Sequence, residues 1–194
     1  MEVIIVIIWI DGTYGVGKTT VSMEIKKRFT DCEIEVLEAD VYYEKFTSQI
    51  IDIAKQKNCM PNIGGTLPQN NIRFLQSFKK MIEEKIQNKD KKILVDMSLT
   101  MTECKENLFD VLLDNGKRII HIILVGEEDT IKFRIKNDNK RDKQLALEEL
   151  KYNLCFLKEN FDDAIRIKTD KREISDIADE IIQIINHSQE NNYL

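Results

Sequence analysis

Short runs of β-branched apolar residues alternate along the chain with longer segments of helical periodicity. This alternation is typical of βαβ units that build a mostly parallel sheet. The first run is almost unbroken, as in a strand covered by helices on both faces. Strands are expected at residues 3–10, 34–37, 92–97, 118–125 and 163–168. The pattern therefore predicts an α/β fold.

The helical segments fill the spaces between these strands. Helical periodicity covers residues 18–29, 47–57, 71–88, 103–115, 127–136, 144–160 and 174–185. Residues 58–70 contain both prolines of the chain and are expected to form a loop. No repeat and no linker rich in Pro, Gly or Ser divides the sequence. We therefore expect a single domain over residues 1–187, with residues 188–194 as a frayed tail.

Three of the seven glycines fall within six residues, between the first predicted strand and the first predicted helix. Residues 12–19 match the P-loop pattern G-x(4)-G-K-[ST], whose curled backbone points its N–H groups at phosphate oxygens. The helix dipole adds positive potential. Lys18 is expected to reach the β- and γ-phosphates of ATP, and Thr19 to ligate Mg²⁺. The expected nucleotide-binding residues are Gly12, Thr13, Tyr14, Gly15, Val16, Gly17, Lys18, Thr19 and Thr20.

Two carboxylates follow predicted strands, at the edge of a parallel sheet where ligands gather. Asp40 is expected to end the second strand, where it can accept a proton from a substrate hydroxyl that attacks the γ-phosphate. The alternative is a helix N-cap or a loop acid. Asp96 ends an apolar strand, which is the Walker B pattern, and is expected to hold Mg²⁺ directly or through water. The alternative is a capping acid before Ser98 and Thr100.

Basic residues gather around residues 134–145, between two predicted helices. They are Arg134, Lys136, Lys140, Arg141 and Lys143. A polar segment that bears arginines resembles a lid that closes over nucleotide, and arginine stabilises the charge of a transferring phosphoryl group. We therefore expect catalytic roles for Arg134 and Arg141. The alternative is a solvated charged turn.

The acceptor side has weaker candidates. Tyr42, Tyr43 and Phe46 can line a substrate pocket, and Arg73 can anchor an acidic or polar substrate. Aromatic residues at helical spacing also fit the core. Together with Asp40, we take Tyr43 and Arg73 as the expected substrate contacts.

Composition and net charge limit the kinds of partner that we expect the protein to bind. The formal charge of −5 gives no positive field to attract nucleic acid or an anionic membrane. The four cysteines are scattered without a CxxC, which fits reduced thiols in the cytoplasm and disfavours a zinc cluster. The apolar run at residues 3–10 lacks a basic flank and is too short to cross a bilayer. We expect a cytoplasmic protein without a membrane span, as a monomer or a homodimer.

Several stretches resemble a known family. Residues 9–19 read W-I-D-G-T-Y-G-V-G-K-T, which resembles the W-I-N-G-x-x-G-x-G-K-T of the tunicamycin-resistance family of P-loop proteins. Residues 67–73, L-P-Q-N-N-I-R, are similar to a Q/L-P…W-R segment of that family, and V-D-M-S-L-T at residues 95–100 to its V-P-M-T-L-T. Residues 163–170 and the amphipathic helix after them are like the end of many small kinases.

The resemblance implies a nucleoside-monophosphate-kinase-like fold, a three-layer α/β/α arrangement around a five-stranded parallel sheet of order 2-3-1-4-5, with ATP and Mg²⁺. Chloramphenicol phosphotransferase, a related small-molecule kinase, uses an acid after its second strand as base, and Asp40 occupies that place. Arg134 and Arg141 approximately match an arginine near adenine and a lid arginine that meets the phosphates. Asp11 replaces the family's common Asn. Asp96 replaces its proline and makes the chain look more like a metal-binding kinase.

The sequence thus predicts an ATP-binding enzyme that transfers the γ-phosphate to a small, nucleoside- or antibiotic-like acceptor. A resistance protein that binds a nucleoside-like antibiotic such as tunicamycin, and transfers nothing, is the alternative. A GTPase is disfavoured because the chain has no N-K-x-D guanine signature. A motor is disfavoured because 194 residues leave little room for its extra helical domain.

Overall fold

The computed structural model describes residues 6–30, 33–87, 91–138 and 143–190. Five parallel strands form one sheet in the order β2-β3-β1-β4-β5, as expected. Their bounds are β1 (Val6–Asp11), β2 (Ile34–Glu38), β3 (Lys92–Asp96), β4 (Arg118–Val125) and β5 (Ile165–Lys168). The first three residues of the predicted first strand, 3–5, lie outside the described residues.

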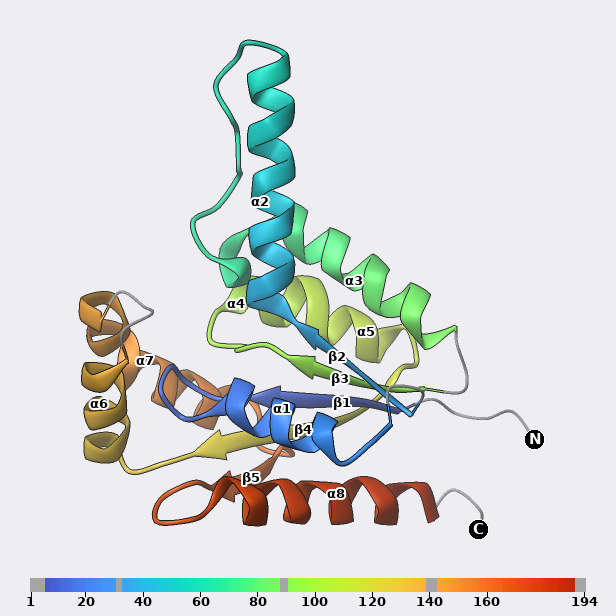
Figure 1. Cartoon of the computed structure of the whole chain (residues 1–194), viewed down its shortest axis with the longest axis vertical. Helices are drawn as coiled ribbons and strands as arrows, with labels where there is room; N and C mark the ends of the chain where they lie inside the picture. The colour runs from blue at the N-terminus through green and yellow to red at the C-terminus, as the bar shows by residue number, and fades with distance from the viewer. Residues whose placement is uncertain (1–5, 31–32, 88–90, 139–142, 191–194) are drawn as a thin grey trace.

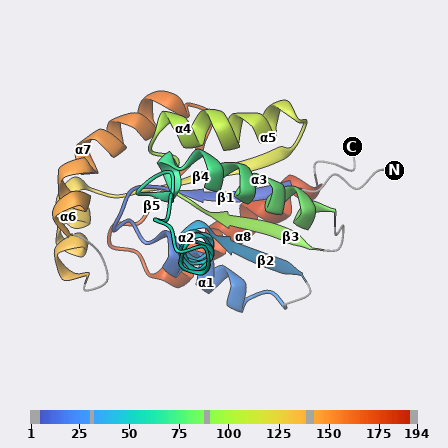
Figure 2. The same ribbon diagram turned by 90° about the horizontal axis from the view of Figure 1, so that it is seen from above.

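Helices cover both faces of the sheet, so the expected three-layer α/β/α arrangement is confirmed (Figures 1 and 2). Helices α1 (Lys18–Lys27) and α8 (Ile174–Glu190) pack against each other on one face. Elements of the other face are α3 (Ile72–Ile86), the short α4 (Thr102–Cys104), the π-helix η2 (Lys105–Phe109) and α5 (Asp110–Asp114). The remaining helices are α2 (Ala39–Gln56), the 3₁₀ turn η1 (Pro68–Asn70), α6 (Glu128–Asn137) and α7 (Lys143–Asn160).

Strand β1 is buried along its whole length, and its side chains alternate between two apolar clusters. Ile7 and Trp9 belong to the cluster beneath α3 and η2. Ile8 and Ile10 belong to the cluster beneath α1 and α8. A strand covered on both faces reads as a continuous apolar run, which explains the pattern at the start of the sequence.

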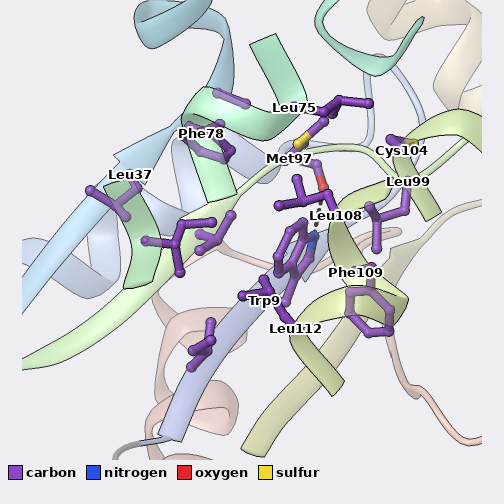
Figure 3. Packing of buried hydrophobic residues seen from close by; sticks show 14 of the residues in the cluster. Trp9, Leu37, Leu75, Phe78, Met97, Leu99, Cys104, Leu108, Phe109 and Leu112 are labelled. Carbon is purple, nitrogen blue, oxygen red and sulfur yellow. Dashed lines mark hydrogen bonds between the residues drawn. The ribbon is translucent and has the colours of Figure 1, made fainter. Parts of the chain in front are cut away.

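Trp9 anchors the centre of the first cluster and fixes the backbone beside the loop that follows β1 (Figure 3). Its side chain is fully buried, and its ring meets Phe109 edge-on at 5.3 Å between centroids. The indole Nε1 donates a hydrogen bond of 3.0 Å to the carbonyl of Met97. Because Met97 directly follows β3, this bond ties the end of β3 to β1.

Parallel pairing brings the carboxyl ends of three strands together. Ile10 of β1 pairs with Asp96 of β3, and Glu38 of β2 pairs with the same residue. Ligand sites of open parallel sheets lie at this edge. The loop after β1 and the acids after β2 and β3 are therefore neighbours in space.

Three elements differ from the expected ones. Helix α2 begins at Ala39, directly after β2, and not near residue 47. Asp40 therefore lies in the first turn of a helix, and not at the end of a strand. The helix expected at residues 103–115 contains the π-helical segment η2. Helix α8 continues to Glu190, past the expected end of the domain, and residues 191–194 lie outside the described residues.

Helix α2 extends away from the body of the molecule, and the chain returns along it before η1 (Figure 1). Its first half packs on α3, where Tyr43 and Phe46 of α2 both lie against Phe74 of α3. Within the described ranges, no helix is both long and apolar enough to cross a membrane.

Candidate functional site

The loop between β1 and α1 requires glycine for both conformation and space. Gly12 has a φ of 140°, and a Cβ there would lie 2.7 Å from Val16 Cγ1 and 2.8 Å from the carbonyl oxygen of Leu124. Gly15 has a φ of 75°, and its Cβ would lie 2.8 Å from Ile135 Cγ1. These are contacts that a larger residue cannot relieve without moving β4 or α6.

Lys18, the first residue of α1, folds back over the loop. Its ammonium donates hydrogen bonds to the carbonyls of Gly12, at 2.9 Å, and Thr13, at 3.2 Å. The Ser98 hydroxyl also donates to the Gly12 carbonyl, at 2.8 Å. No acidic residue occupies the first turn of α1, so the positive end of its dipole is not neutralised from within the helix. The loop thus offers an ammonium and a helix N-terminus to an anion.

Asp11, the last residue of β1, supports this loop through buried hydrogen bonds. Its side chain is fully buried, and Oδ1 accepts hydrogen bonds from the backbone N–H of Gly12, at 2.6 Å, and of Leu99, at 2.9 Å. Oδ2 lies 3.0 Å from Nε2 of His121, whose ring packs between Phe109 and Phe161. The carboxylate joins the start of the loop to the segment after β3.

A small pocket of about 110 Å³ lies at the carboxyl ends of β1, β2 and β3. Its lining residues are Tyr14, Lys18, Thr19, Glu38, Asp40, Gln69, Asp96, Met97 and Ser98. Five residues expected from the sequence, Tyr14, Lys18, Thr19, Asp40 and Asp96, thus share one pocket. With Glu38, three carboxylates meet a lysine and hydroxyl groups there.

Burial, together with neighbouring carboxylates, raises the pKa of two acids of the pocket, Asp96 and Glu38. Asp96 is 6% exposed, and burial raises its pKa above the ordinary value, against the effects of the Lys18 ammonium and the Thr19 hydroxyl. Burial also raises the pKa of Glu38, and the neighbouring Asp96 and Asp40 add to that shift. The pocket therefore favours a cation or a proton between these groups.

This donor set fits Mg²⁺ that arrives with a nucleotide. Asp96 Oδ2 is buried without a hydrogen-bond partner among the described residues. Within the same residues, no group of three or more His, Cys, Asp and Glu side chains is arranged to hold a metal by itself. Mg²⁺ is usually bound by one or two carboxylates together with phosphate oxygens and water. Thr19 and Asp96 match that mode of binding.

Of the two arginines expected to act in catalysis, Arg134 lies within the described residues and Arg141 does not. Arg134 of α6 donates hydrogen bonds to the carbonyl of Val16, at 3.3 Å, and to the hydroxyl and carbonyl of Thr169, at 3.0 and 3.1 Å. It borders the loop from the side of β4 and β5 and does not line the pocket. Arg141 lies outside the described residues. So do residues 139, 140 and 142 of the expected lid, which spans 134–145.

The two other expected substrate residues hold the chain that returns along α2. The Tyr43 hydroxyl donates to the carbonyl of Gly65, at 2.7 Å, and Arg73 donates to the carbonyl of Asn62, at 3.0 Å. Neither lines the pocket. Tyr43 also packs against the first apolar cluster, so its geometry favours the alternative of core packing.

Four lining residues were not among the sequence candidates. Glu38, Met97 and Ser98 stand at the carboxyl ends of β2 and β3, so the rule for parallel sheets was a signal that points to them. Gln69 lies in η1, within the loop expected at residues 58–70, and the family resemblance of residues 67–73 was a signal that included it.

No protein-family model matches the chain, and the search of curated proteins finds no match either. Solved structures do match. The tunicamycin resistance protein of Deinococcus radiodurans is 18% identical with a TM-score of 0.71, over 94% of this chain and 95% of that one. The chain has a P-loop kinase fold. A gluconokinase from Sinorhizobium meliloti 1021 is 14% identical with a TM-score of 0.62, over 96% of this chain and 95% of that one.

The APS kinase of Mycobacterium tuberculosis, solved in complex with AMPPNP and APS, shares the same P-loop kinase fold. It is 15% identical with a TM-score of 0.59, over 94% of this chain and 98% of that one. At these identities the likeness establishes the fold, and the function has to be argued from the residues of the site.

Proposed function

We propose that the protein is an ATP-dependent phosphotransferase that passes the γ-phosphoryl group to a hydroxyl of a small, nucleoside- or antibiotic-like acceptor. One observation carries this proposal: the P-loop residues Lys18 and Thr19 share a pocket with Asp40 and Asp96. Transfer to a hydroxyl needs a phosphate cradle, a metal ligand and a general base at one place.

Each group of the pocket has a role in this proposal. The loop amides and the N-terminus of α1 hold the phosphates, and the Lys18 ammonium moves from the loop carbonyls to the β- and γ-phosphates. Thr19 and Asp96 would hold Mg²⁺, which, when bound, neutralises charge on the phosphate oxygens. Catalysis then rests mainly on positioning and on charge neutralisation.

Asp40 is the base of the reaction. The acceptor oxygen forms a bond to the γ-phosphorus, and the bond from this phosphorus to the β,γ-bridging oxygen breaks. The electron pair of that bond stays on ADP, and the hydroxyl proton passes to the Asp40 carboxylate. Asp40 is exposed at the start of α2, so it can return the proton to solvent.

The other residues expected from the sequence have supporting roles in this proposal. Arg134 holds Val16 against Thr169 and thereby forms the wall of the nucleotide site on the side of α6. We assign Arg141 to the phosphates as a lid residue. Tyr43 and Arg73 support the acceptor side by holding the chain that returns along α2.

A product assay tests the proposal. The protein is incubated with ATP, Mg²⁺ and a panel of nucleosides and hydroxyl-bearing antibiotics, and each compound is examined for a mass gain of one phosphate. Lys18→Ala should lower turnover on the order of 100-fold or more, because it removes a charge from the transition state. Lys27→Ala, on the exposed side of the same helix, is the matched control. A folded Lys18→Ala variant that retains full turnover would refute the assignment.

The fold match to a tunicamycin resistance protein favours one other function, in which the chain binds a nucleoside-like antibiotic and transfers nothing. The same assay separates the two. Tight binding of a panel member without any phosphorylated product supports the second function and contradicts the first.

A further inference from the structure

Gln69 places an unpartnered polar atom in the pocket that holds the proposed reaction. The side chain is 4% exposed and lines the pocket together with Lys18 and Asp96. Its Oε1 is buried and accepts no hydrogen bond from any described residue. A buried carbonyl without a donor costs free energy, so such an atom in a binding pocket marks a place where a ligand supplies the donor.

The neighbours of Gln69 use their amides to build the turn, and Gln69 does not. Asn70 Oδ1 accepts the backbone N–H of Leu67, at 3.1 Å. Asn71 Oδ1 caps α3 by accepting the N–H of Phe74, at 3.0 Å. These bonds fix η1, so Gln69 is presented to the pocket from a supported backbone.

The charges around Gln69 restrict what binds there. The pocket is lined by three carboxylates, those of Glu38, Asp40 and Asp96, and by one cation, Lys18, which belongs to the phosphate loop. No arginine and no second lysine lines the described pocket. An acceptor that carries a phosphate, sulfate or carboxylate would meet these three carboxylates, and the Lys18 ammonium is the one cationic side chain that lines the described pocket.

We propose that the acceptor is an uncharged or cationic alcohol, and that Gln69 Oε1 selects it by accepting a hydrogen bond from one of its N–H or O–H groups. This inference deepens the proposed phosphotransferase function and rests on it. The pocket volume of about 110 Å³ is enough for the reacting end of such a molecule only. Gln69 is a specificity residue that touches the acceptor, and Asp40 remains the base.

The test compares three probes that share one nucleoside scaffold with its 2′- and 3′-hydroxyls and differ in charge at the 5′ position, with nucleotide present. Uridine is the neutral probe, uridine 5′-monophosphate the anionic probe, and 5′-amino-5′-deoxyuridine the cationic one. Product is measured by mass with ATP and Mg²⁺, and binding is measured by calorimetry with AMPPNP and Mg²⁺. The variants are Gln69→Leu, which keeps the size and removes the acceptor atom, and the control Gln76→Leu on the exposed face of α3.

We expect the neutral and cationic probes to bind and react at least tenfold better than the anionic one. Gln69→Leu should raise KM for them about tenfold or more with little change in kcat, while AMPPNP binding and the Gln76→Leu variant stay at the wild-type level. A preference for uridine 5′-monophosphate, or a Gln69→Leu KM within twofold of wild type, overturns the inference and leaves the phosphotransferase proposal standing. Selective, Gln69-dependent binding without product refutes the transferase and, with it, the role of the bound molecule as acceptor, and keeps Gln69 only as the residue that selects the ligand. Failure of every probe to bind contradicts both.

Discussion

Replacing Asp11 tests whether the phosphate loop is held in place by the buried carboxylate beneath it. In Asp11→Ala, the backbone N–H groups of Gly12 and Leu99 lose their common acceptor, and His121 loses its partner. Gly12 and Leu99 are both buried residues. A buried donor left unsatisfied costs about 1–3 kcal/mol, so the two together cost about 2–6 kcal/mol. That is a large part of the stability of a typical domain.

Asp11→Asn is the matched variant. The amide oxygen of Asn can accept the same two N–H groups, and its NH₂ can donate to Nε2 of neutral His121. We therefore expect its free energy of unfolding within about 1 kcal/mol of wild type, as is usual when a hydrogen bond is exchanged for another.

The assay is equilibrium unfolding in urea for all three proteins, followed by titration of each with AMPPNP and Mg²⁺. Asp11→Ala should show a lower unfolding midpoint and weaker nucleotide binding, because the hydrogen bond from the Gly12 N–H to the Asp11 carboxylate also positions Gly12. If Asp11→Ala has the wild-type midpoint and binds nucleotide as well as wild type, the carboxylate does not organise the loop.

Two further outcomes follow from the pKa shifts. Burial raises the pKa of Asp96 above its ordinary 3.8, so its charged form is disfavoured in the folded protein, and Mg²⁺ must displace a proton below this raised pKa. Affinity for AMPPNP with Mg²⁺ should therefore rise as pH rises through that range. Asp96→Asn should remove this part of the pH dependence. If calorimetry gives the same pH profile for Asp96→Asn as for wild type, Asp96 does not hold Mg²⁺. Burial also raises the pKa of Cys104 to about 12, so its thiol should react with a disulfide reagent far more slowly than the exposed Cys59, and equal rates for two cysteines would show that Cys104 is accessible.

Local patterns in the sequence were enough to predict most of the sheet. The eight apolar-rich residues of β4 were predicted at 118–125, and the order of the strands followed from the family resemblance. The proximity of Asp96 and Thr19 was predictable as well, because parallel strands bring their carboxyl ends to one edge.

The start of α2 was not predicted, because Val41, Tyr42 and Tyr43 form a β-branched and aromatic run that hides the helical period. Packing of Tyr42 on Phe78 of α3 is a tertiary contact that local periodicity does not contain. Gln69 was missed for a related reason. It lies in η1, which is held by contacts with α2, α3 and α4, so its place in the pocket depends on tertiary contacts that local sequence patterns do not contain.

Binding of a nucleoside triphosphate to the loop at residues 12–19 is the central claim, and calorimetry tests it most directly. Purified, folded protein is titrated with AMPPNP in the presence of Mg²⁺, beside Lys18→Ala and Lys27→Ala. We expect saturable one-site binding that Lys18→Ala weakens strongly and Lys27→Ala leaves unchanged. Folded wild-type protein that takes up neither AMPPNP nor GTP with Mg²⁺ would show that the loop is not a nucleotide site.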